Sequence, residues 1–180
     1  MYLDALRAVS PVTDDGAVNV FVETPAGSDH KIDLNHETGL LEWSLELPEG
    51  MRFPFAFGFV PNTLAEDGDA LDILLMLRGT IPAGSMVRAR LIGVLRAEQD
   101  EADDGEVDTR NDRVIAVPVL AQSYSNVQEV SDLRDNQYRE LAAFFRRYNE
   151  MIDRAFEAGE PGDSAFVREQ LDAAIERAKG

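Results

Sequence analysis

Cysteine is absent from this sequence of 180 residues, which excludes disulfide bonds and thiolate metal sites. Histidine occurs only at His30 and His36, and both are too isolated along the chain to suggest metal ligands. No apolar run approaches the ~20 residues that a membrane-spanning helix needs. The first ten residues also lack the basic start and apolar block of a signal peptide. We therefore expect a cytoplasmic protein without a membrane partner.

Basic residues are scarce. The chain has 17 Lys and Arg against 34 Asp and Glu, which gives a formal net charge of -17. Such a surface repels nucleic acid, so we expect no nucleic-acid partner. It would also repel an anionic substrate, unless local cations or bound metals reverse the field at the site. The alternative is that the acidity serves only solubility or adaptation to high salt.

Hydrophobic patterning predicts an α+β fold, in which short strands come first and helices last. The length fits one domain over residues 1–180 with a core over about 18–152. The expected strands span residues 18–23, 30–34, 40–47, 71–77, 86–95 and 113–119. We expect residues 1–16 to form a loosely attached arm. The aromatic stretch 53–61, interrupted by Pro and Gly, predicts an irregular buried segment.

The last third of the chain has the apolar spacing of helices. A first helix, capped at Ser131 or Asp132, presents one apolar stripe. The stripe consists of Tyr138, Leu141, Phe145, Tyr148 and Ile152. A second helix spans about 163–179 and is capped near Asp163 or Ser164.

One acidic stretch suggests metal binding. Asp67 and Asp69 flank Gly68, and Asp72 follows at the start of an apolar strand. Strand alternation sends the Asp72 side chain to the face opposite its apolar neighbours. If that face lines a cavity, three carboxylates converge there, and hard cations such as Mg²⁺ or Mn²⁺ are the usual counter-charge. A solvated acidic turn is the alternative, and spacing alone does not decide between them.

Several short segments, in this order along the chain, resemble the soluble inorganic pyrophosphatases of family I. They are residues 20–27, 31–34, 38–41, 53–64, 67–72, 81–85, 93–95 and 115–118, and then Phe144, Phe145 and Tyr148. The resemblance covers about residues 18–152, although Ala70 stands where the family usually has proline. It implies a small five-stranded OB-like β-barrel with flanking C-terminal helices. It also implies Mg²⁺-dependent hydrolysis of pyrophosphate to two phosphates by a water that the metal activates.

The resemblance also implies roles for the acidic residues. Asp67 and Asp72 match metal ligands of the family. Asp69 matches the carboxylate that takes a proton from the attacking water, and it belongs to the same metal-binding cluster. Glu23 and Asp33 match acids at the cavity rim that contribute to metal binding. Asp33 replaces a glutamate, which shortens its reach by one methylene.

The acidic loop 98–108 should provide two more metal-binding aspartates and a lysine, but it aligns ambiguously. Gln99 or Asp100 fills the first aspartate position, and we take Asp100 as the candidate metal ligand. Two pairs compete for the second aspartate and the lysine: Asn111 with Arg113, and Asp108 with Arg110. We take Arg113 as the candidate substrate-binding residue.

Two further residues match phosphate-binding and catalytic side chains of the family, Lys31 and Tyr148. Patterning by itself gives them a plainer interpretation. Lys31 and Asp33 lie on one side of a strand, which is typical of a solvated pair, and Tyr148 belongs to an apolar helix stripe. Only the joint match of order, spacing and signature supports a role in the site.

Three phosphate-binding positions depart from the family pattern. Leu45 replaces an arginine, Phe57 a tyrosine and Asn149 a lysine. The departures predict a weakened or less specific enzyme, unless other cations take over. The candidate replacements are Arg52, Arg78, Arg88 and Arg113.

The departures leave alternative functions open. One is a metal-dependent hydrolase of another phosphoanhydride or phosphoester, and the other is a non-catalytic relative that binds phosphate or a protein partner. The family resemblance further implies a homo-oligomer. Trp43 is then expected in the core or in a subunit contact.

Overall fold

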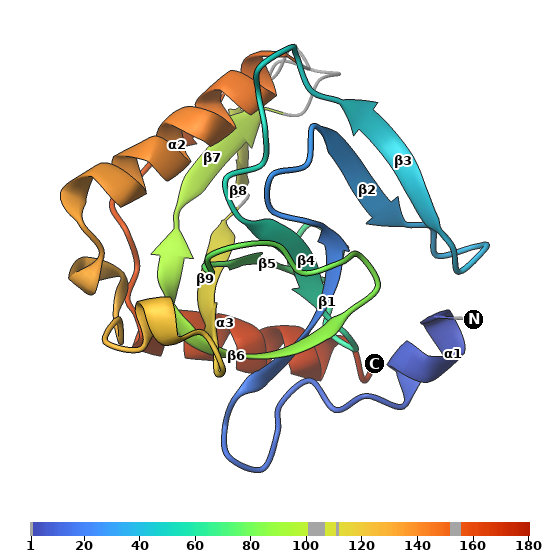
Figure 1. Cartoon of the computed structure of the whole chain (residues 1–180). Coiled ribbons are helices and arrows are strands. Elements are labelled where there is room, and N and C mark those ends of the chain that lie inside the picture. Colours follow the sequence, from blue (N-terminus) through green and yellow to red (C-terminus); the bar gives the residue numbers. More distant parts are fainter. Residues whose placement is uncertain (1, 101–106, 111, 152–155) are drawn as a thin grey trace.

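The computed structural model describes residues 2–100, 107–110, 112–151 and 156–180, and a closed β-barrel of five strands forms the centre of this part (Figure 1). The strands, in their order around the barrel, are β1 (Val18–Thr24), β4 (Ala56–Val60), β5 (Leu71–Leu75), β9 (Arg113–Pro118) and β6 (Met86–Leu95). Neighbouring strands are antiparallel except for β5 and β9, which run parallel. The predicted α+β fold with an OB-like barrel is confirmed.

Alternate residues of the barrel strands divide between two apolar clusters, as the period of a strand requires. Ile73 and Leu75 belong to a cluster that includes Val167 and Leu171 of α3 (Ser164–Arg177). Leu74, which lies between them on β5, belongs to a cluster that includes residues of α2 (Asp135–Glu150). The barrel therefore has a helix on each of two sides (Figure 1).

The second predicted helix is confirmed at its start, and the first begins later than expected. The carboxylate of Asp163 caps α3 by accepting a hydrogen bond from the Phe166 amide at 2.9 Å. Asp132 instead ends a 3₁₀ turn, η2 (Val130–Asp132), where its carboxylate accepts from the backbone amides of residues 128 and 129. It is therefore not available to cap α2, and Arg134 stands at the N-cap. No helix among the described residues is long and apolar enough to span a membrane.

Smaller sheets and turns surround the barrel. A hairpin pairs β2 (His30–Leu34) with β3 (Leu41–Glu46), and a separate sheet has the order β10 (Phe156–Ala158), β7 (Ala97–Asp100), β8 (Val107–Arg110). A further 3₁₀ turn, η1, covers Gln122–Tyr124. Trp43 on β3 is 64% exposed, which excludes the core as its place and leaves the alternative of a subunit contact as a prediction. Its ring instead contacts the His30 ring edge to face.

The aromatic stretch 53–61 is more regular than predicted, because it contains barrel strand β4. Gly58 explains how this strand fits. A Cβ atom at residue 58 would lie 2.0 Å from the carbonyl oxygen of Phe21, so only glycine allows β4 to approach β1 this closely. The glycine that suggested irregularity is thus a requirement of the barrel.

The first residues are also better attached than predicted. They form a short helix, α1 (Tyr2–Arg7), whose Leu6 is buried against Phe21 and Leu34. Asn62 ties this segment to the barrel, since its side-chain amide donates to the carbonyls of Leu6 and Val9 at 3.0 and 2.7 Å. The N-terminal arm is therefore part of the packed structure.

Candidate active site

A cleft of about 320 Å³ lies between the barrel, the β2–β3 hairpin and α2. Its lining combines charged and aromatic side chains: Glu23, Lys31, Asp33, Leu34, His36, Phe53, Phe57, Phe59, Asp69, Ala70, Asp72, Arg113, Phe145 and Tyr148. All the predicted site residues whose side chains the structure describes are in this lining, except Asp67. The predicted residues in the lining come from five separate elements and from the loop before β5.

The hairpin strand β2 provides a lysine and a carboxylate that form an ion pair. Lys31 and Asp33 lie on the same face of β2, and Lys31 Nζ is 2.9 Å from Asp33 Oδ1. Burial opposes the charged form of Lys31, but attraction to Asp33, Tyr148 and Asp72 outweighs it and raises the lysine pKa. Lys31 therefore presents a stable positive charge to the cleft.

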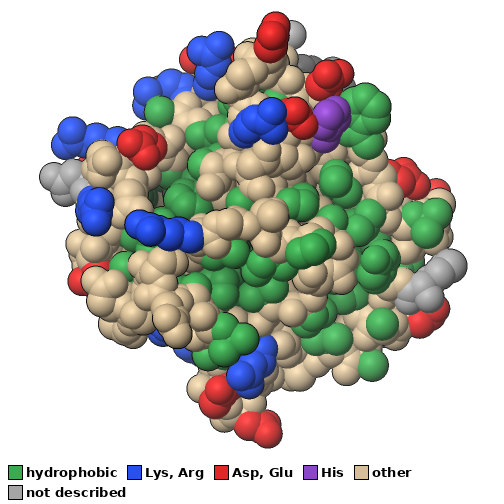
Figure 2. All heavy atoms as spheres, in the orientation of Figure 1, with side chains coloured by type: hydrophobic (Ala, Val, Ile, Leu, Met, Phe, Trp, Pro, Cys, Tyr) green, Lys and Arg blue, Asp and Glu red, His purple; other side chains and the backbone are tan. Residues whose placement is uncertain are grey.

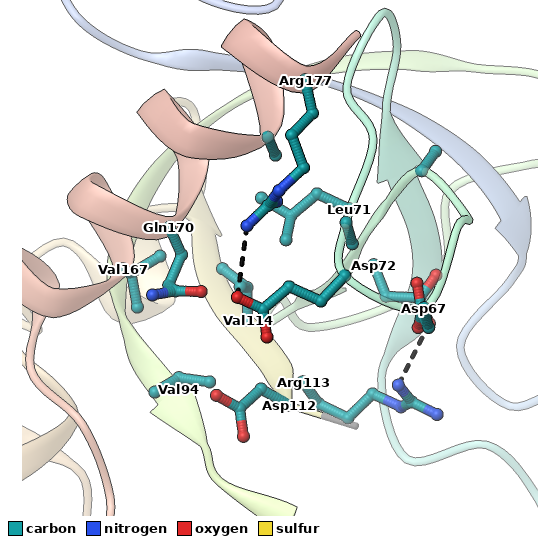
Figure 3. A pocket seen from close by; sticks show the side chains of 14 residues that line it. Asp67, Leu71, Asp72, Val94, Asp112, Arg113, Val114, Val167, Gln170 and Arg177 are labelled. Carbon is teal, nitrogen blue, oxygen red and sulfur yellow. Dashed lines mark hydrogen bonds and ion pairs between the residues drawn. The ribbon is translucent and has the colours of Figure 1, made fainter. Parts of the chain in front are cut away.

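A second ion pair joins the parallel strands β5 and β9. Arg113 Nη1 lies 3.2 Å from Asp72 Oδ2, as the dashed line in Figure 3 marks. The arginine side chain is only 13% exposed, and its guanidinium carbon is 5.8 Å from the ring centres of both Phe57 and Phe145. Burial raises the pKa of Asp72 to about 6, although Arg113 and Lys31 act to lower it. The cleft thus holds a cation close to two aromatic rings and next to a carboxyl group whose pKa is raised by burial.

Glu23 is the least solvent-exposed carboxyl group of the cleft. It is 7% exposed on β1, and its Oε1 accepts a hydrogen bond from the Leu34 amide at 2.7 Å. Burial raises the pKa of Glu23 to about 8, and the negative charges of Asp33 and Asp72 add to the effect. Neighbouring carboxylates thus add to the raised pKa values of Glu23 and Asp72, an effect that a bound cation would reverse.

The loop between β4 and β5 separates its two aspartates. Asp69 lines the cleft, whereas Asp67 lines a smaller pocket of about 50 Å³ that also borders Asp72, Asp112 and Arg113 (Figure 3). The Asp69 amide donates to Asp67 Oδ1 at 3.1 Å, and Gly68 between them has a φ of 91°, which favours glycine. Asp72 therefore lines both pockets, one together with Asp67 and the other together with Asp69.

Comparison with known proteins shows to which family this chain belongs. The family model described as inorganic pyrophosphatase matches residues 20–179. The chain belongs to the inorganic pyrophosphatase family. An inorganic pyrophosphatase of Saccharolobus solfataricus is 33% identical over 165 residues, which cover 90% of this chain and 92% of the relative. One of Brucella melitensis biotype 1 is 32% identical over 184 residues, covering 100% of this chain and 99% of the relative.

A solved structure has the same fold. The inorganic pyrophosphatase from Helicobacter pylori superposes with a TM-score of 0.86 at 27% identity, covering 96% of this chain and 99% of that one. The prediction of an inorganic diphosphatase with a small barrel is therefore confirmed at the level of family, enzyme class and fold.

The three departures from the pyrophosphatase pattern occupy different surroundings. Phe57 lines the cleft, but Leu45 and Asn149 are outside its lining. Leu45 pairs with Lys31 across the hairpin, where it is half-buried. Asn149 is 2% exposed, and its amide donates to the Phe145 carbonyl at 2.9 Å. Of the three positions where a donor of the family is missing, only residue 57 therefore lies in the cleft wall.

Of the four arginines that were candidates to replace those donors, only Arg113 lines the cleft. Arg52 is held by Asp29 at 3.4 Å, and Arg88 lies 3.9 Å from Asp15. Arg78 lines a different, smaller pocket of about 140 Å³. Among the four candidates, Arg113 is therefore the one placed to contact a substrate in the cleft, and its role there stays a prediction.

The carboxylate oxygens of the cleft are the donors that Mg²⁺ and Mn²⁺ prefer, and they are more numerous than the nearby cations. Their chemistry therefore fits a hard divalent cation. In the part of the chain that the structure describes, however, no group of three or more His, Asp or Glu side chains is arranged to hold a metal ion. Asp100 ends β7, and its side chain, like all of residue 111, lies outside the described part.

Sequence reasoning missed several residues of the site. Phe53, Phe59, Phe145 and His36 line the cleft, and nothing in their spacing distinguished them from core or loop residues. Asp112 was also missed, although it directly precedes Arg113. Figure 3 shows it across the smaller pocket from Asp67, and its Oδ1 accepts from the Ala97 amide at 3.2 Å.

Proposed function

We propose that this protein hydrolyses inorganic pyrophosphate to two phosphates and that Mg²⁺, or Mn²⁺ in its place, is required. The observation that carries the proposal is the cleft itself, where Lys31 and Arg113 lie among four carboxyl groups. Cations for phosphate and oxygen ligands for metal are thereby combined in one site, in a chain of the pyrophosphatase family.

The residues of the site then have roles in binding substrate, transferring a proton and holding the cation. Lys31, Arg113 and the Tyr148 hydroxyl bind the phosphoryl groups, and Arg113 is suited to a two-point contact with phosphate oxygens. Asp69 accepts the proton of the attacking water, and Lys31 and Tyr148 stabilise the charge that develops on the phosphoryl oxygens. The side chains that would hold the cation are Asp67, Asp69, Asp72, Asp100, Glu23 and Asp33. When bound, the cation would neutralise substrate charge and lower the pKa of a water molecule.

Phosphate release from pyrophosphate by the purified full chain tests this proposal, with Mg²⁺ and with EDTA in parallel. Asp72→Asn and Asp69→Asn should each lower turnover at least ~10²-fold, because changes even to groups outside the ligand set cost ~10–100-fold. Circular dichroism of both variants checks that the fold is intact. Unchanged turnover in both would remove this cleft as the active site.

A related phosphohydrolase activity is the second candidate, and Phe57 is the observation that favours it. Its ring is part of the cleft wall where the family has a tyrosine hydroxyl. A less polar wall suits a phosphoanhydride with an organic group better than bare pyrophosphate. Assays with a nucleoside triphosphate and with an aryl phosphate, at equal concentration, separate the two. A higher kcat/KM for either substrate than for pyrophosphate would favour this second candidate.

Three further expectations belong to the same proposal. The protein acts in the cytoplasm, residues 1–180 form a single functional domain, and the active form is a homo-oligomer. Localisation of a fluorescent fusion tests the first of these, and limited proteolysis of the metal-free protein tests the second.

A further inference from the structure

The last turn of α3 contacts the loop that carries Asp67 and Asp69. Arg177 Nη1 donates to the Leu64 carbonyl at 3.1 Å. Arg177 Nη2 donates to Glu66 Oε1 at 3.2 Å, as the dashed line at Arg177 in Figure 3 marks. One turn earlier, the Ala174 carbonyl accepts a hydrogen bond from the Leu64 amide at 2.9 Å. The helix therefore holds residues 64 and 66 at three points.

Hydrogen bonds within the loop extend this attachment to the aspartates. The Ala65 amide donates to the Asp69 carbonyl at 2.7 Å, and the Gly68 amide donates to the Ala65 carbonyl at 3.3 Å. The Asp69 amide in turn donates to the Asp67 carboxylate. The loop is thus a compact turn. Its start is tied to the barrel by Thr63, whose hydroxyl donates to the Val60 carbonyl and accepts from the Leu71 amide. Residues 64 and 66 are held by α3.

We propose that Arg177 is a positioning residue for this loop and that it sets the affinity of the aspartate site for its metal ion. The inference rests on the proposed function, in which Asp67, Asp69 and Asp72 bind the cation. Asp72 is fixed by β5, whereas Asp67 and Asp69 are exposed on the loop. The three carboxylates can act together only if the loop is held against the strand, and Arg177 is the side chain that holds it from outside.

The ion pair alone does not explain such a role. Arg177 and Glu66 are 36% and 58% exposed, and pairs of this kind contribute little to stability. The importance of the guanidinium lies in its two-point contact, which joins a backbone carbonyl and a carboxylate in one fixed geometry. Lysine carries the same charge but lacks the planar fork, so it cannot reproduce that geometry.

Positioning and simple electrostatics predict opposite results, which makes the proposal testable. Arg177 is a positive charge near the carboxylates, so if only its field mattered, its removal would strengthen metal binding. If it positions the loop, its removal weakens metal binding. Arg177→Lys separates the two effects, because it keeps the charge and loses the two-point contact.

The experiment is calorimetric titration of Mg²⁺ into the metal-free full chain, without substrate. The proteins compared are the wild type, Arg177→Met, Arg177→Lys and the matched control Lys179→Met. Lys179 pairs with Glu176 in the same turn, so its change also removes one positive charge but leaves the loop contacts intact. We expect Arg177→Met to weaken Mg²⁺ binding about 10-fold. Arg177→Lys should weaken it at least as much, because lysine loses the two-point contact and keeps the charge that repels the cation. Lys179→Met should bind as well as the wild type or better.

Thermal unfolding of the metal-free proteins provides the second readout. A role confined to stability would lower the midpoint of Arg177→Met and leave its Mg²⁺ affinity unchanged, and that result overturns the proposal. Tighter binding by Arg177→Met, with Arg177→Lys like the wild type, overturns it in favour of a simple field effect. Titration of Mg²⁺ into Asp72→Asn tests the proposed function itself, on which the role of Arg177 rests. If that variant binds Mg²⁺ like the wild type, the proposed metal site is wrong and the role of Arg177 falls with it.

Discussion

The buried carboxyl group of Glu23 makes the stability of the folded protein depend on pH. Its pKa is about 8 in the fold against an ordinary value of 4.5, so between these values the folded protein binds more protons than the unfolded chain. The free energy of unfolding therefore falls as pH rises through this range. We expect urea unfolding of the metal-free protein to show this fall and Glu23→Gln to reduce it.

The Glu23 experiment has a direct control on the neighbouring hairpin. Glu46→Gln removes an exposed carboxylate and should leave the pH dependence as it is in the wild type. Measurements at pH 5 and pH 8 suffice, because only the difference between them matters. If Glu23→Gln and Glu46→Gln behave alike, the buried carboxyl group is not the source of the dependence.

We expect restoration of the family residue to have different effects on turnover and stability at Phe57 and at Asn149. Phe57→Tyr adds a hydroxyl to the cleft wall beside Arg113, and we expect pyrophosphate turnover to rise, by up to about 10²-fold, since one well-placed donor can contribute this much. Asn149→Lys instead places a charge at a buried site and removes the bond to the Phe145 carbonyl. It should lower the thermal midpoint without a comparable gain in rate.

Steady-state phosphate release and thermal unfolding of the two single variants check this prediction. Leu45→Arg is the comparison, because residue 45 is half-buried beside Lys31 and outside the cleft lining. A fall in turnover on Phe57→Tyr would mean that the aromatic wall is itself adapted to the substrate.

At the scale of elements, the strands that alternate cleanly could be predicted from sequence. The limits of β2 and β6 match their predictions, and β1, β3, β5 and β9 differ by one or two residues at their ends. Strand β4 could not be predicted, because Pro54 and Gly58 are typical of irregular chain, and only its partner β1 explains the glycine. The start of α2 was predicted wrongly for a similar reason, because the Asp132 carboxylate already accepts hydrogen bonds within another turn.

The closeness of β1 and β4 leads to a prediction about Gly58. Gly58→Ala would place a methyl group 2.0 Å from the Phe21 carbonyl oxygen, so the two strands must separate. We expect the free energy of unfolding to fall by about 1–3 kcal/mol, the usual cost of overpacking, or by more because the clash is with backbone. Urea unfolding measures it.

Gly159→Ala is the matched control for Gly58→Ala. The nearest atom to a Cβ at residue 159 is 3.5 Å away, which is an ordinary contact. This variant should unfold within about 0.5 kcal/mol of the wild type. Equal effects of the two substitutions would show that the barrel relaxes around residue 58.

At the scale of the molecule, the acids of the site were easier to predict than its geometry. The motif around Asp67, Asp69 and Asp72 is local in sequence and could be found directly. The pairing of Asp72 with Arg113 depends on the parallel contact of β5 with β9, which no local pattern encodes. The division of Asp67 and Asp69 between two pockets likewise depends on how α3 packs against the loop.

The surface of the whole molecule supports the proposed oligomer. Figure 2 shows hydrophobic side chains gathered across the middle of the face it presents. Large apolar side chains are exposed, with Leu120 at 88% and Trp43 at 64%. Exposed apolar patches of this kind mark interaction sites. We expect sedimentation at micromolar concentration to give a multiple of 19.9 kDa. A mass near that of one chain would rule out the homo-oligomer.

The pairing of β5 with β9 also sets an order of events during synthesis. Asp67, Asp69 and Asp72 leave the ribosome well before Arg113, which is the buried cation that faces them once the barrel has closed. Until β9 takes its place between β5 and β6, the growing chain carries a cluster of acids without this internal counter-charge. The strand that completes the barrel thus also brings the positive charge that opposes the repulsion among these acids.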